Sequence, residues 1–420
     1  MPVSIPTTRR GTMIINTLTY GSVCSGIEAV TIAWQNLPLK PVWFSEIEPF
    51  PSAVLEYHWP QIPNHGDMTQ LADKIAKGDI SAPDVLVGGT PCQSFSVAGR
   101  RQGLIDPRGQ LTLAYIRLAD AIDAKRKEEN QHAAIILWEN VPGVLSDTTN
   151  AFGHFLAGLA GTDCPFTPGL PPVRKRSDAF WRWSKKCDHP VPKWPRAGCV
   201  YGARRTIAWR TMDAQYLGLG QRRKRLYVIA SADKGFDPAR ILFEFDSMPG
   251  NSASGCGTEP SVTPLSASDT DSSELSTIVY NRQRTGEYIR ATVSSTCNAS
   301  DYKSAHDLAL SPVFCIAGNT IGRNLPHGGH GRGLSQELCY TLDTSHTAHA
   351  VATAYTVRRL MPTEYERLQG FPDNHTQIPW RGKPAQQCPD SLRYKALGNS
   401  MPVPVIKWIG ERLHHYYFSR

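Results

Sequence analysis

A short apolar run at residues 84–87 ends at two consecutive glycines, and Pro91 and Cys92 follow almost at once. The length of the run and its glycine boundary are typical of a buried strand. The fixed φ of Pro91 then delivers Cys92 to the carboxyl end of that strand, where open α/β sheets bind their ligands. The polar, basic, glycine-containing sequence up to Gly109 is typical of a mobile loop over a site. This stretch therefore favours an α/β sheet with a cysteine at its ligand-binding edge.

The same alternation of strand and helix extends through much of the chain. Further strands are predicted at residues 14–23, 41–45, 133–137, 207–212 and 226–230. Helical spacing is found at residues 29–37 and 110–125, and again at 358–371 and 403–416. Buried strands that alternate with helices are the pattern of a doubly wound, Rossmann-like α/β fold.

Several candidate binding residues follow these predicted strands. Gly26 lets the backbone approach a ligand, and Glu46 stands where such folds hold ribose hydroxyls. Asp67 suits an adenine amino group, although it could equally be a helix N-cap. Glu139 follows the strand at 133–137, on the same sheet edge as Cys92, although an ordinary exposed glutamate is the alternative.

Two cationic side chains are further candidates. Four basic residues, 222–225, immediately precede the strand at 226–230, so Arg223 and Arg225 point to the same side. Such a run is otherwise a solvated face. Cys92 is also open to two interpretations. It could be a small buried hydrophobe, or a thiolate that adds to an electron-poor ring such as cytosine.

Composition narrows the class of protein. The chain has 420 residues, a formal net charge of +8 and ten cysteines without any Cys-x-x-Cys pair. These features indicate reduced thiols in a cytoplasmic protein and permit a polyanionic partner. No run is long and apolar enough to span a membrane. Cys164, Cys187, His189 and Cys199 match no standard zinc spacing, so no metal is predicted.

Two segments depart from the α/β pattern. Residues 167–205 are rich in proline, tryptophan and basic residues. They either bind along the phosphates of a nucleic-acid backbone or form a solvated insertion. Residues 277–356 have short β-like runs among turn residues, which predicts a separate, loop-rich module.

Taken in order, these motifs resemble those of the DNA (cytosine-5)-methyltransferases of bacterial and phage type. The blocks that carry the resemblance are residues 22–29, Glu46, Asp67, 89–96, 139–141, 221–225, 358–372 and 398–400. The resemblance implies an S-adenosyl-L-methionine-binding domain at 13–235, completed by 394–420. It implies a smaller target recognition domain and hinge at 236–393.

The resemblance also implies roles for individual residues. Cys92 attacks C6 of a flipped-out cytosine in double-stranded DNA, Glu139 stabilises N3, Arg225 contacts O2, and Arg223 holds the closed loop or phosphates. The implied cofactor-binding residues are Cys24, Ser25, Gly26, Ile27, Glu46, Ile47, Asp67, Met68, Asn399 and Ser400. A monomer that acts on nucleoid DNA is expected, and the resemblance is compatible with a cognate restriction endonuclease.

Some positions depart from the family pattern. Cys24 replaces the usual Phe, Glu28-Ala29 replaces Gly-Gly, and Gly220 replaces Pro. We expect altered cofactor packing with the reacting groups retained. Two alternatives remain: a tRNA cytosine-5 methyltransferase with the same chemistry, and a non-catalytic DNA-binding regulator.

Overall fold

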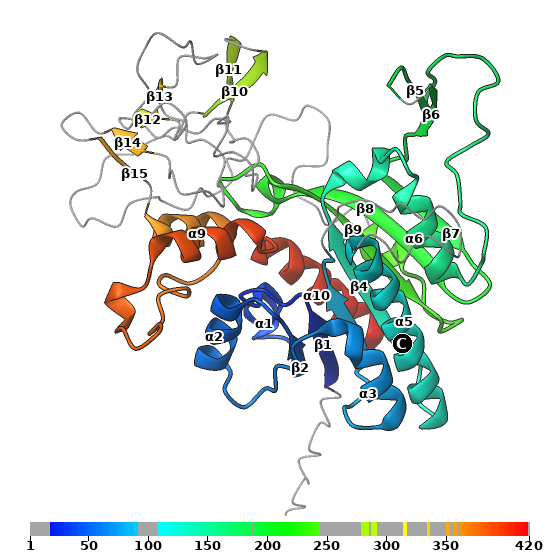
Figure 1. The fold of residues 1–420 in the computed structure, drawn as a ribbon, viewed down its shortest axis with the longest axis horizontal. Coiled ribbons are helices and arrows are strands. Elements are labelled where there is room, and N and C mark those ends of the chain that lie inside the picture. The colour runs from blue at the N-terminus through cyan, green and yellow to red at the C-terminus, as the bar shows by residue number, and fades with distance from the viewer. Residues whose placement is uncertain are drawn as a thin grey trace, which may run out of the picture.

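One mixed seven-stranded sheet organises the chain. Its strands are β1 (Leu18–Val23), β2 (Leu39–Ser45), β3 (Val85–Gly88), β4 (Ile135–Asn140), β7 (Ala197–Tyr201), β8 (Thr206–Asp213) and β9 (Lys224–Ser231). They lie in the order β2-β1-β3-β4-β9-β8-β7 (Figure 1). The first four are parallel, and β9, β8 and β7 add antiparallel strands. This computed structural model describes residues 17–90, 107–186, 188–243 and 361–418, with six short strands between 279 and 359.

Helices cover both faces of this sheet, as the predicted fold class requires. On one face lie α1 (Ala29–Trp34) and α10 (Val403–Phe418), and on the other α3 (Leu71–Lys77), α5 (Pro107–Glu128) and α6 (Ala151–Ala160). Each face has its own apolar cluster, because strands buried on both sides present alternate side chains to the two helical layers. The prediction of a doubly wound α/β domain is confirmed.

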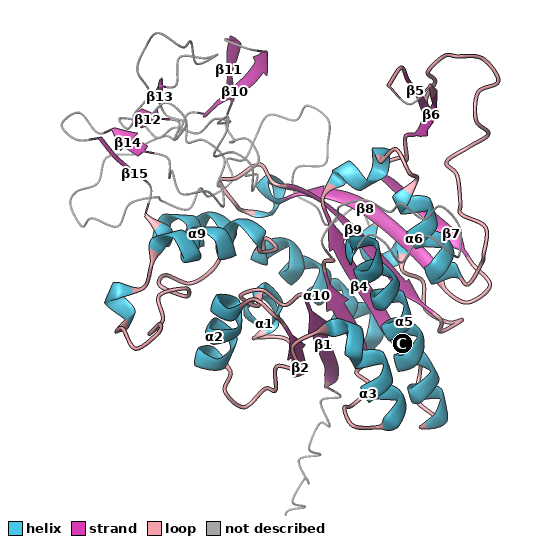
Figure 2. Cartoon of the chain, viewed as in Figure 1, coloured by secondary structure: helices cyan, strands magenta, loops and turns pink. Residues whose placement is uncertain are grey.

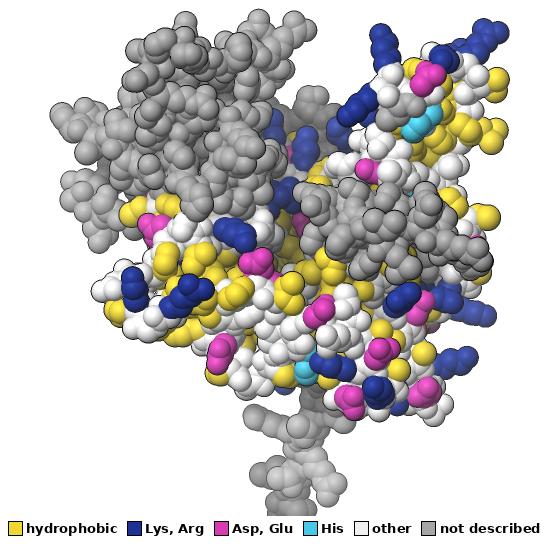
Figure 3. Space-filling view, in the orientation of Figure 1, with side chains coloured by type: hydrophobic (Ala, Val, Ile, Leu, Met, Phe, Trp, Pro, Cys, Tyr) yellow, Lys and Arg dark blue, Asp and Glu magenta, His cyan; other side chains and the backbone are white. Residues whose placement is uncertain are grey.

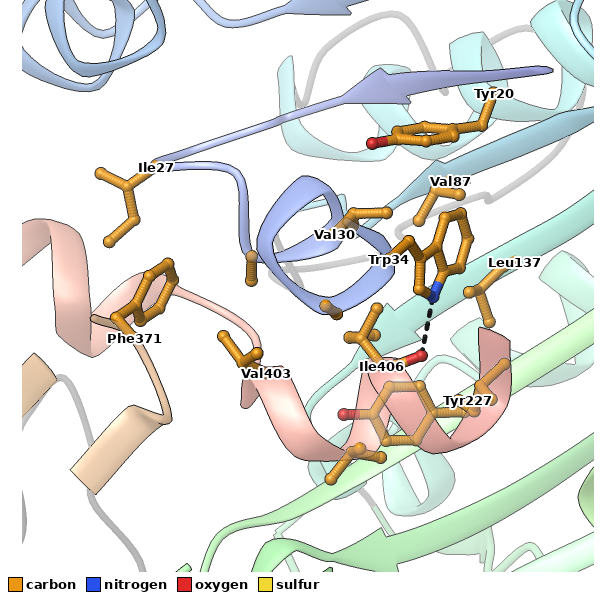
Figure 4. Packing of buried hydrophobic residues seen from close by; sticks show 14 of the residues in the cluster. Tyr20, Ile27, Val30, Trp34, Val87, Leu137, Tyr227, Phe371, Val403 and Ile406 are labelled. Carbon is orange, nitrogen blue, oxygen red and sulfur yellow. Dashed lines mark hydrogen bonds between the residues drawn. The ribbon is translucent and has the colours of Figure 1, made fainter. Parts of the chain in front are cut away.

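The C-terminal helix is part of the core although it lies far from α1 in sequence. The indole Nε1 of Trp34 donates to the carbonyl of Ile406 at 2.8 Å (Figure 4). A Cβ at Gly410 would lie 2.1 Å from the same Nε1, so only glycine lets α10 approach this closely. Residues 403–418 thereby complete one helical layer over the seven-stranded sheet.

The parallel strands create a crevice at their carboxyl ends. Strand β1 lies between β2 and β3, so the chain reverses its direction of strand addition at this point. Loops that follow neighbouring strands on the two sides of such a reversal separate and leave room for a ligand. The segments that follow β1, β2, β3 and β4 meet at this edge (Figure 1).

Other elements lie outside the seven-stranded sheet. Long loops carry the hairpin β5 (Trp181–Ser184) and β6 (His189–Pro192) away from it (Figure 2). The short strands form two further sheets: β10 (Val279–Arg284) with β11 (Glu287–Ala291), and β12 (Phe314–Ile316), β13 (Leu334–Gln336), β14 (Ala350–Ala352) and β15 (Val357–Arg359). The remaining longer helices are α2 (Pro49–His58), α8 (Pro362–Gln369) and α9 (Asp390–Asn399). No helix among the described residues is long and apolar enough to cross a membrane.

Several predicted element boundaries differ from the structure, and two of the differences have a clear physical reason. The helix expected at 358–371 starts only at Pro362, because Val357–Arg359 pairs as β15 with β14 and proline is well suited to the first helical turn. The strand expected at 133–137 runs instead from Ile135 to Asn140, so Glu139 lies inside the strand. Antiparallel pairing with β9 along its full length extends β4 past the apolar run.

Candidate active site

An open cavity of about 1150 Å³ lies at the carboxyl ends of β1 to β4. Most of the predicted site residues line it: Cys24, Gly26, Glu46, Ile47, Asp67, Met68, Glu139, Arg223, Arg225 and Asn399. Residues from both ends of the chain therefore meet in one cavity. Its lining combines polar and charged residues with apolar ones such as Phe50 and Leu392, which the sequence did not indicate.

The turn after β1 is held by Glu46. Gly26 has a left-handed φ of 57°, and a Cβ built on it would meet nothing within 4 Å, so its backbone faces open space. The amide of Gly26 donates to Glu46 Oε2 at 2.8 Å, while the amides of Ile47 and Glu48 donate to Oε1 at 2.9 and 2.8 Å. A carboxylate oxygen can accept two hydrogen bonds, so Oε2 keeps capacity for a ligand hydroxyl.

Asp67 and two sulfur-containing residues form the next part of the wall. One oxygen of Asp67 accepts from the amide of Thr69 at 2.9 Å, so the N-cap interpretation is correct for Oδ1. The thiol of Cys24 lies 3.6 Å from the Met68 sulfur. Burial, together with the nearby charges of Glu46 and Asp67, raises the pKa of the Cys24 thiol to about 12. Cys24 is therefore a neutral, polarisable wall group.

Glu28, which departs from the family pattern, does not line the cavity. Its carboxyl is fully buried and accepts from the Ser22 hydroxyl at 2.9 Å, and from the amide and hydroxyl of Thr31 at 3.2 and 3.1 Å. Burial raises the pKa of Glu28 to about 7, although these hydrogen bonds oppose the shift. The residue caps α1 from a left-handed φ of 60°.

Glu139 and Arg225 form an ion pair at the other side of the cavity. Arg225 Nε lies 3.1 Å from Glu139 Oε1, and the two side chains are 10% and 14% exposed. Burial raises the pKa of the Glu139 carboxyl above its ordinary value, even though Arg225 and Arg223 oppose the shift. A carboxyl in this environment keeps its proton to a higher pH than an ordinary glutamate does, and it can donate that proton to a bound base.

The segment that follows β3 is held beside Glu139 by hydrogen bonds to Thr90. The Asn140 amide donates to the carbonyl of Thr90 at 2.9 Å, and the Trp138 indole donates to its hydroxyl at 3.1 Å. The Thr90 hydroxyl also bonds with that of Thr112. Cys92, the predicted nucleophile, lies outside the described residues, two positions beyond this anchored point.

Arg223 connects the cavity to the C-terminal segment. Its guanidinium is almost fully buried and donates from Nη2 to the carbonyls of Gly398 and Ser400, at 2.9 and 2.8 Å. Asn399, which lines the cavity, lies between these two carbonyls. The sequence placed Arg223 in the site but did not indicate this contact, since its partners lie about 175 residues away.

Three predicted cofactor residues do not line the cavity. Ser25 donates its hydroxyl to the Ser22 carbonyl at 3.0 Å, and Ile27 is buried in the apolar cluster that also holds Phe371 and Val403 (Figure 4). Ser400 contributes its carbonyl to Arg223. These residues shape the cavity wall from behind, and a direct role in ligand binding stays a prediction.

Comparisons with known proteins agree with this geometry. The model of the C-5 cytosine-specific DNA methylase family matches residues 18–163 and 204–415. The "Type II methyltransferase M2.BsuMI" of Bacillus subtilis is 23% identical over 394 residues, covering 93% of this chain and 74% of that protein. A "DNA N-6-adenine-methyltransferase" of Escherichia phage P1 is 46% identical over 466 residues, covering 94% of this chain. The chain spans only 61% of the length of that phage protein.

Solved structures show the same fold. The "Dnmt2 methyltransferase" of S. pombe aligns over 96% of this chain and 100% of its own, with a TM-score of 0.53 at 15% identity. A "putative DNA modification methyltransferase" from an E. coli prophage aligns over 96% and 100%, with a TM-score of 0.50 at 16% identity. The family match confirms the predicted resemblance, the predicted enzyme class and S-adenosyl-L-methionine as the cofactor. The chain belongs to the C-5 cytosine-specific DNA methylase family.

Proposed function

We propose that the chain methylates C5 of a flipped-out cytosine within a short, specific sequence of double-stranded DNA, through a covalent bond between Cys92 and C6. The observation that carries the proposal is the buried Glu139–Arg225 pair, which shares one cavity with the Gly26–Glu46 turn. The cavity exceeds the roughly 1,000 Å³ at the upper end of small-molecule sites, which supports the binding of a nucleoside donor and a target base in one site.

The residues present fit the donor. Glu46 has acceptor capacity for ribose hydroxyls, Asp67 has a second oxygen for an adenine amino group, and the open space at Gly26 admits the ligand next to the backbone. Asn399, in the C-terminal segment that Arg223 holds, forms the wall of the cavity on the donor side. When bound, S-adenosyl-L-methionine supplies a methyl group activated by its sulfonium charge.

The chain's own residues act on the cytosine. The Cys92 thiolate forms a bond to C6 while Glu139 donates a hydrogen bond or proton to N3, and C5 becomes nucleophilic. Arg225, held in place by Glu139, contacts O2. After C5 is methylated, a base removes the C5 proton, the C6–S bond breaks, and a proton placed on N3 returns to Glu139. The C5–C6 double bond and the Cys92 thiolate are thereby restored.

Product identification tests the proposal directly. The purified chain is incubated with duplex DNA and isotopically labelled S-adenosyl-L-methionine, and the nucleosides are separated by mass spectrometry. Labelled 5-methyl-2′-deoxycytidine is expected from wild type and none from Cys92→Ala, and duplexes with 5-fluorocytosine at the target should trap the wild-type enzyme covalently. Label in N6-methyl-2′-deoxyadenosine, the product that the phage P1 relative's name indicates, would overturn the proposal. Label in tRNA alone would overturn the choice of DNA.

The wider setting follows from a duplex substrate. We propose a monomer that acts in the cytoplasm on nucleoid DNA, either with a cognate restriction endonuclease or without one. The Bacillus subtilis relative carries a "Type II methyltransferase" name, which supports the first arrangement. Deleting the gene in a host that also encodes an endonuclease distinguishes the two, because an unprotected chromosome would be cut.

A further inference from the structure

A segment within the catalytic domain has no counterpart in the family model. The model stops at residue 163 and resumes at residue 204, so it leaves out residues 164–203, which we call the insertion. The insertion contains the β5–β6 hairpin, which extends from the body of the molecule (Figure 1). The family model therefore does not account for what the insertion does.

The insertion is strongly basic and its charge is exposed. Its eight cationic residues are Arg174, Lys175, Arg176, Arg182, Lys185, Lys186, Lys193 and Arg196, and all are solvent-exposed. Figure 3 shows Lys and Arg side chains projecting from this arm. Of these eight cations, only Lys175 has an acidic partner in the described part of the chain, with its Nζ 2.8 Å from Asp188 Oδ1. The other seven cations are available to an anionic partner.

The base of the insertion is a built structure. Trp194 is 7% exposed and packs edge-on against Phe152 and Trp209, at ring-centroid distances of 5.3 and 5.8 Å. Its indole donates to Asn150 Oδ1 at 3.0 Å. The hairpin itself is closed by antiparallel pairing and by the buried side chains of Trp181 and Val191. The charges are therefore presented from an ordered support.

This support is connected to the active site. The backbone amide of Trp194 donates to the Leu145 carbonyl at 2.9 Å. Leu145 belongs to the short helix η2 (Pro142–Ser146), which begins two residues after the end of β4 and whose first residues line the cavity. The insertion thus rises from the same sheet edge that carries Glu139, and a duplex in the site would pass close to its base.

We infer that the insertion binds the phosphate backbone of duplex DNA flanking the target site, independently of sequence. This inference rests on the proposed function. The seven cations that lack an acidic partner in the described part of the chain repel one another, and a polyanion with one charge per ~1.7 Å relieves that repulsion. Leu170 and Val173 are also exposed, which an acidic membrane surface could accommodate. The hydrogen bond from Trp194 to Leu145 ties the insertion to the wall of the active site, and this connection favours DNA as the partner.

The test compares two triple variants with the same change in charge. The first, Arg182→Gln/Lys185→Gln/Lys186→Gln, removes three hairpin cations. The control, Lys77→Gln/Lys127→Gln/Lys234→Gln, removes three exposed lysines at the opposite edge of the sheet. Affinity for a long duplex is measured across salt concentrations, with and without the target sequence. Thermal unfolding and the affinity for the methyl donor check that both variants are intact.

The hairpin variant should bind both duplexes more weakly, and its slope of log affinity against log salt should fall by roughly 0.9 for each phosphate that it no longer binds. The control should match wild type, and turnover at saturating DNA should be unchanged in both. If wild type methylates DNA but the hairpin variant and the control have equal slopes of log affinity against log salt, the inference is overturned. Weakened binding that is limited to vesicles of anionic phospholipid would also overturn it. Absence of DNA methylation by wild type would instead overturn the proposed function.

Discussion

Glu139 and Arg225 meet across two antiparallel strands because of the strand register. Glu139 in β4 lies directly opposite Tyr227 in β9, which places Arg225, two residues earlier, diagonally across the pair on the same face. Diagonal neighbours of this kind are within reach of long side chains. The 3.1 Å contact between the guanidinium and the carboxylate is thus built into the sheet, and the sheet positions both groups together.

The first prediction concerns the proton on Glu139. Because burial raises its pKa, the protonated form persists above the ordinary range, and kcat should decline as pH rises through the raised pKa. Glu139→Gln should lower kcat by about 10²–10⁴-fold and remove this decline, while the affinity for the methyl donor is unchanged. Glu129→Gln, at an exposed position, serves as the control. A change in the affinity for the methyl donor with a normal kcat would show that Glu139 acts in binding S-adenosyl-L-methionine and not on the cytosine.

Two adjacent glycines should respond differently to the same substitution. A Cβ at Gly89 would lie 2.9 Å from Glu139 Oε2 and 3.0 Å from the Glu139 carbonyl, so Gly89→Ala should displace the carboxyl. Displacement of a catalytic group by about 1 Å can cost roughly 10²-fold in rate. A Cβ at Gly88 would lie 2.6 Å from the Val23 carbonyl, in the β1–β3 pairing. Gly88→Ala should therefore mainly lower the unfolding temperature, and single-turnover kinetics with thermal unfolding should separate the two effects.

Arg223 should control the methyl donor site through the C-terminal segment. A lysine keeps the charge but cannot reproduce the planar group that reaches the carbonyls of Gly398 and Ser400. Arg223→Lys should weaken donor binding about tenfold, the equivalent of ~1.4 kcal/mol, because Asn399 loses its support. Arg412→Lys is the matched control, since Arg412 also donates to two backbone carbonyls, those of Ile241 and Arg240. Equal donor affinities in the two variants, measured by calorimetry, would argue against a positioning role.

The sequence predicted the parts of the site that depend on local pattern. Glu46 and Glu139 were found because each lies at the end of an apolar run, and strand ends meet at one sheet edge. Contacts between distant segments are not marked by any local pattern in the sequence. The buried ring of His375 hydrogen-bonds the carbonyl of Ile27, 348 residues away, and thereby joins the segment after α8 to the turn after β1. No periodicity in either segment encodes that pairing, so only the folded chain reveals it.

The last prediction concerns the contribution of Glu28, in the turn after β1, to the stability of the fold. Glu28 has a folded-state pKa of about 7, against an ordinary value of 4.5, because burial outweighs its three hydrogen bonds. The native state therefore binds an extra proton between these values, and the stability present below pH 4.5 is lost as pH rises through 7. At 1.36 kcal/mol per unit of pKa, the loss is about 3 kcal/mol.

Glu28→Gln should remove this loss. Urea unfolding at several values between pH 5 and pH 8 gives the difference in stability between variant and wild type, in which other titrating groups, such as the buried His375, cancel. That difference should shift in favour of the variant as pH rises, by roughly 2–3 kcal/mol over the range. Exposed Glu411 provides the control substitution, Glu411→Gln, which removes a carboxylate from the surface and not from the core. A shift in the opposite direction would mean that Ser22 and Thr31 stabilise the Glu28 carboxylate by more than its burial costs.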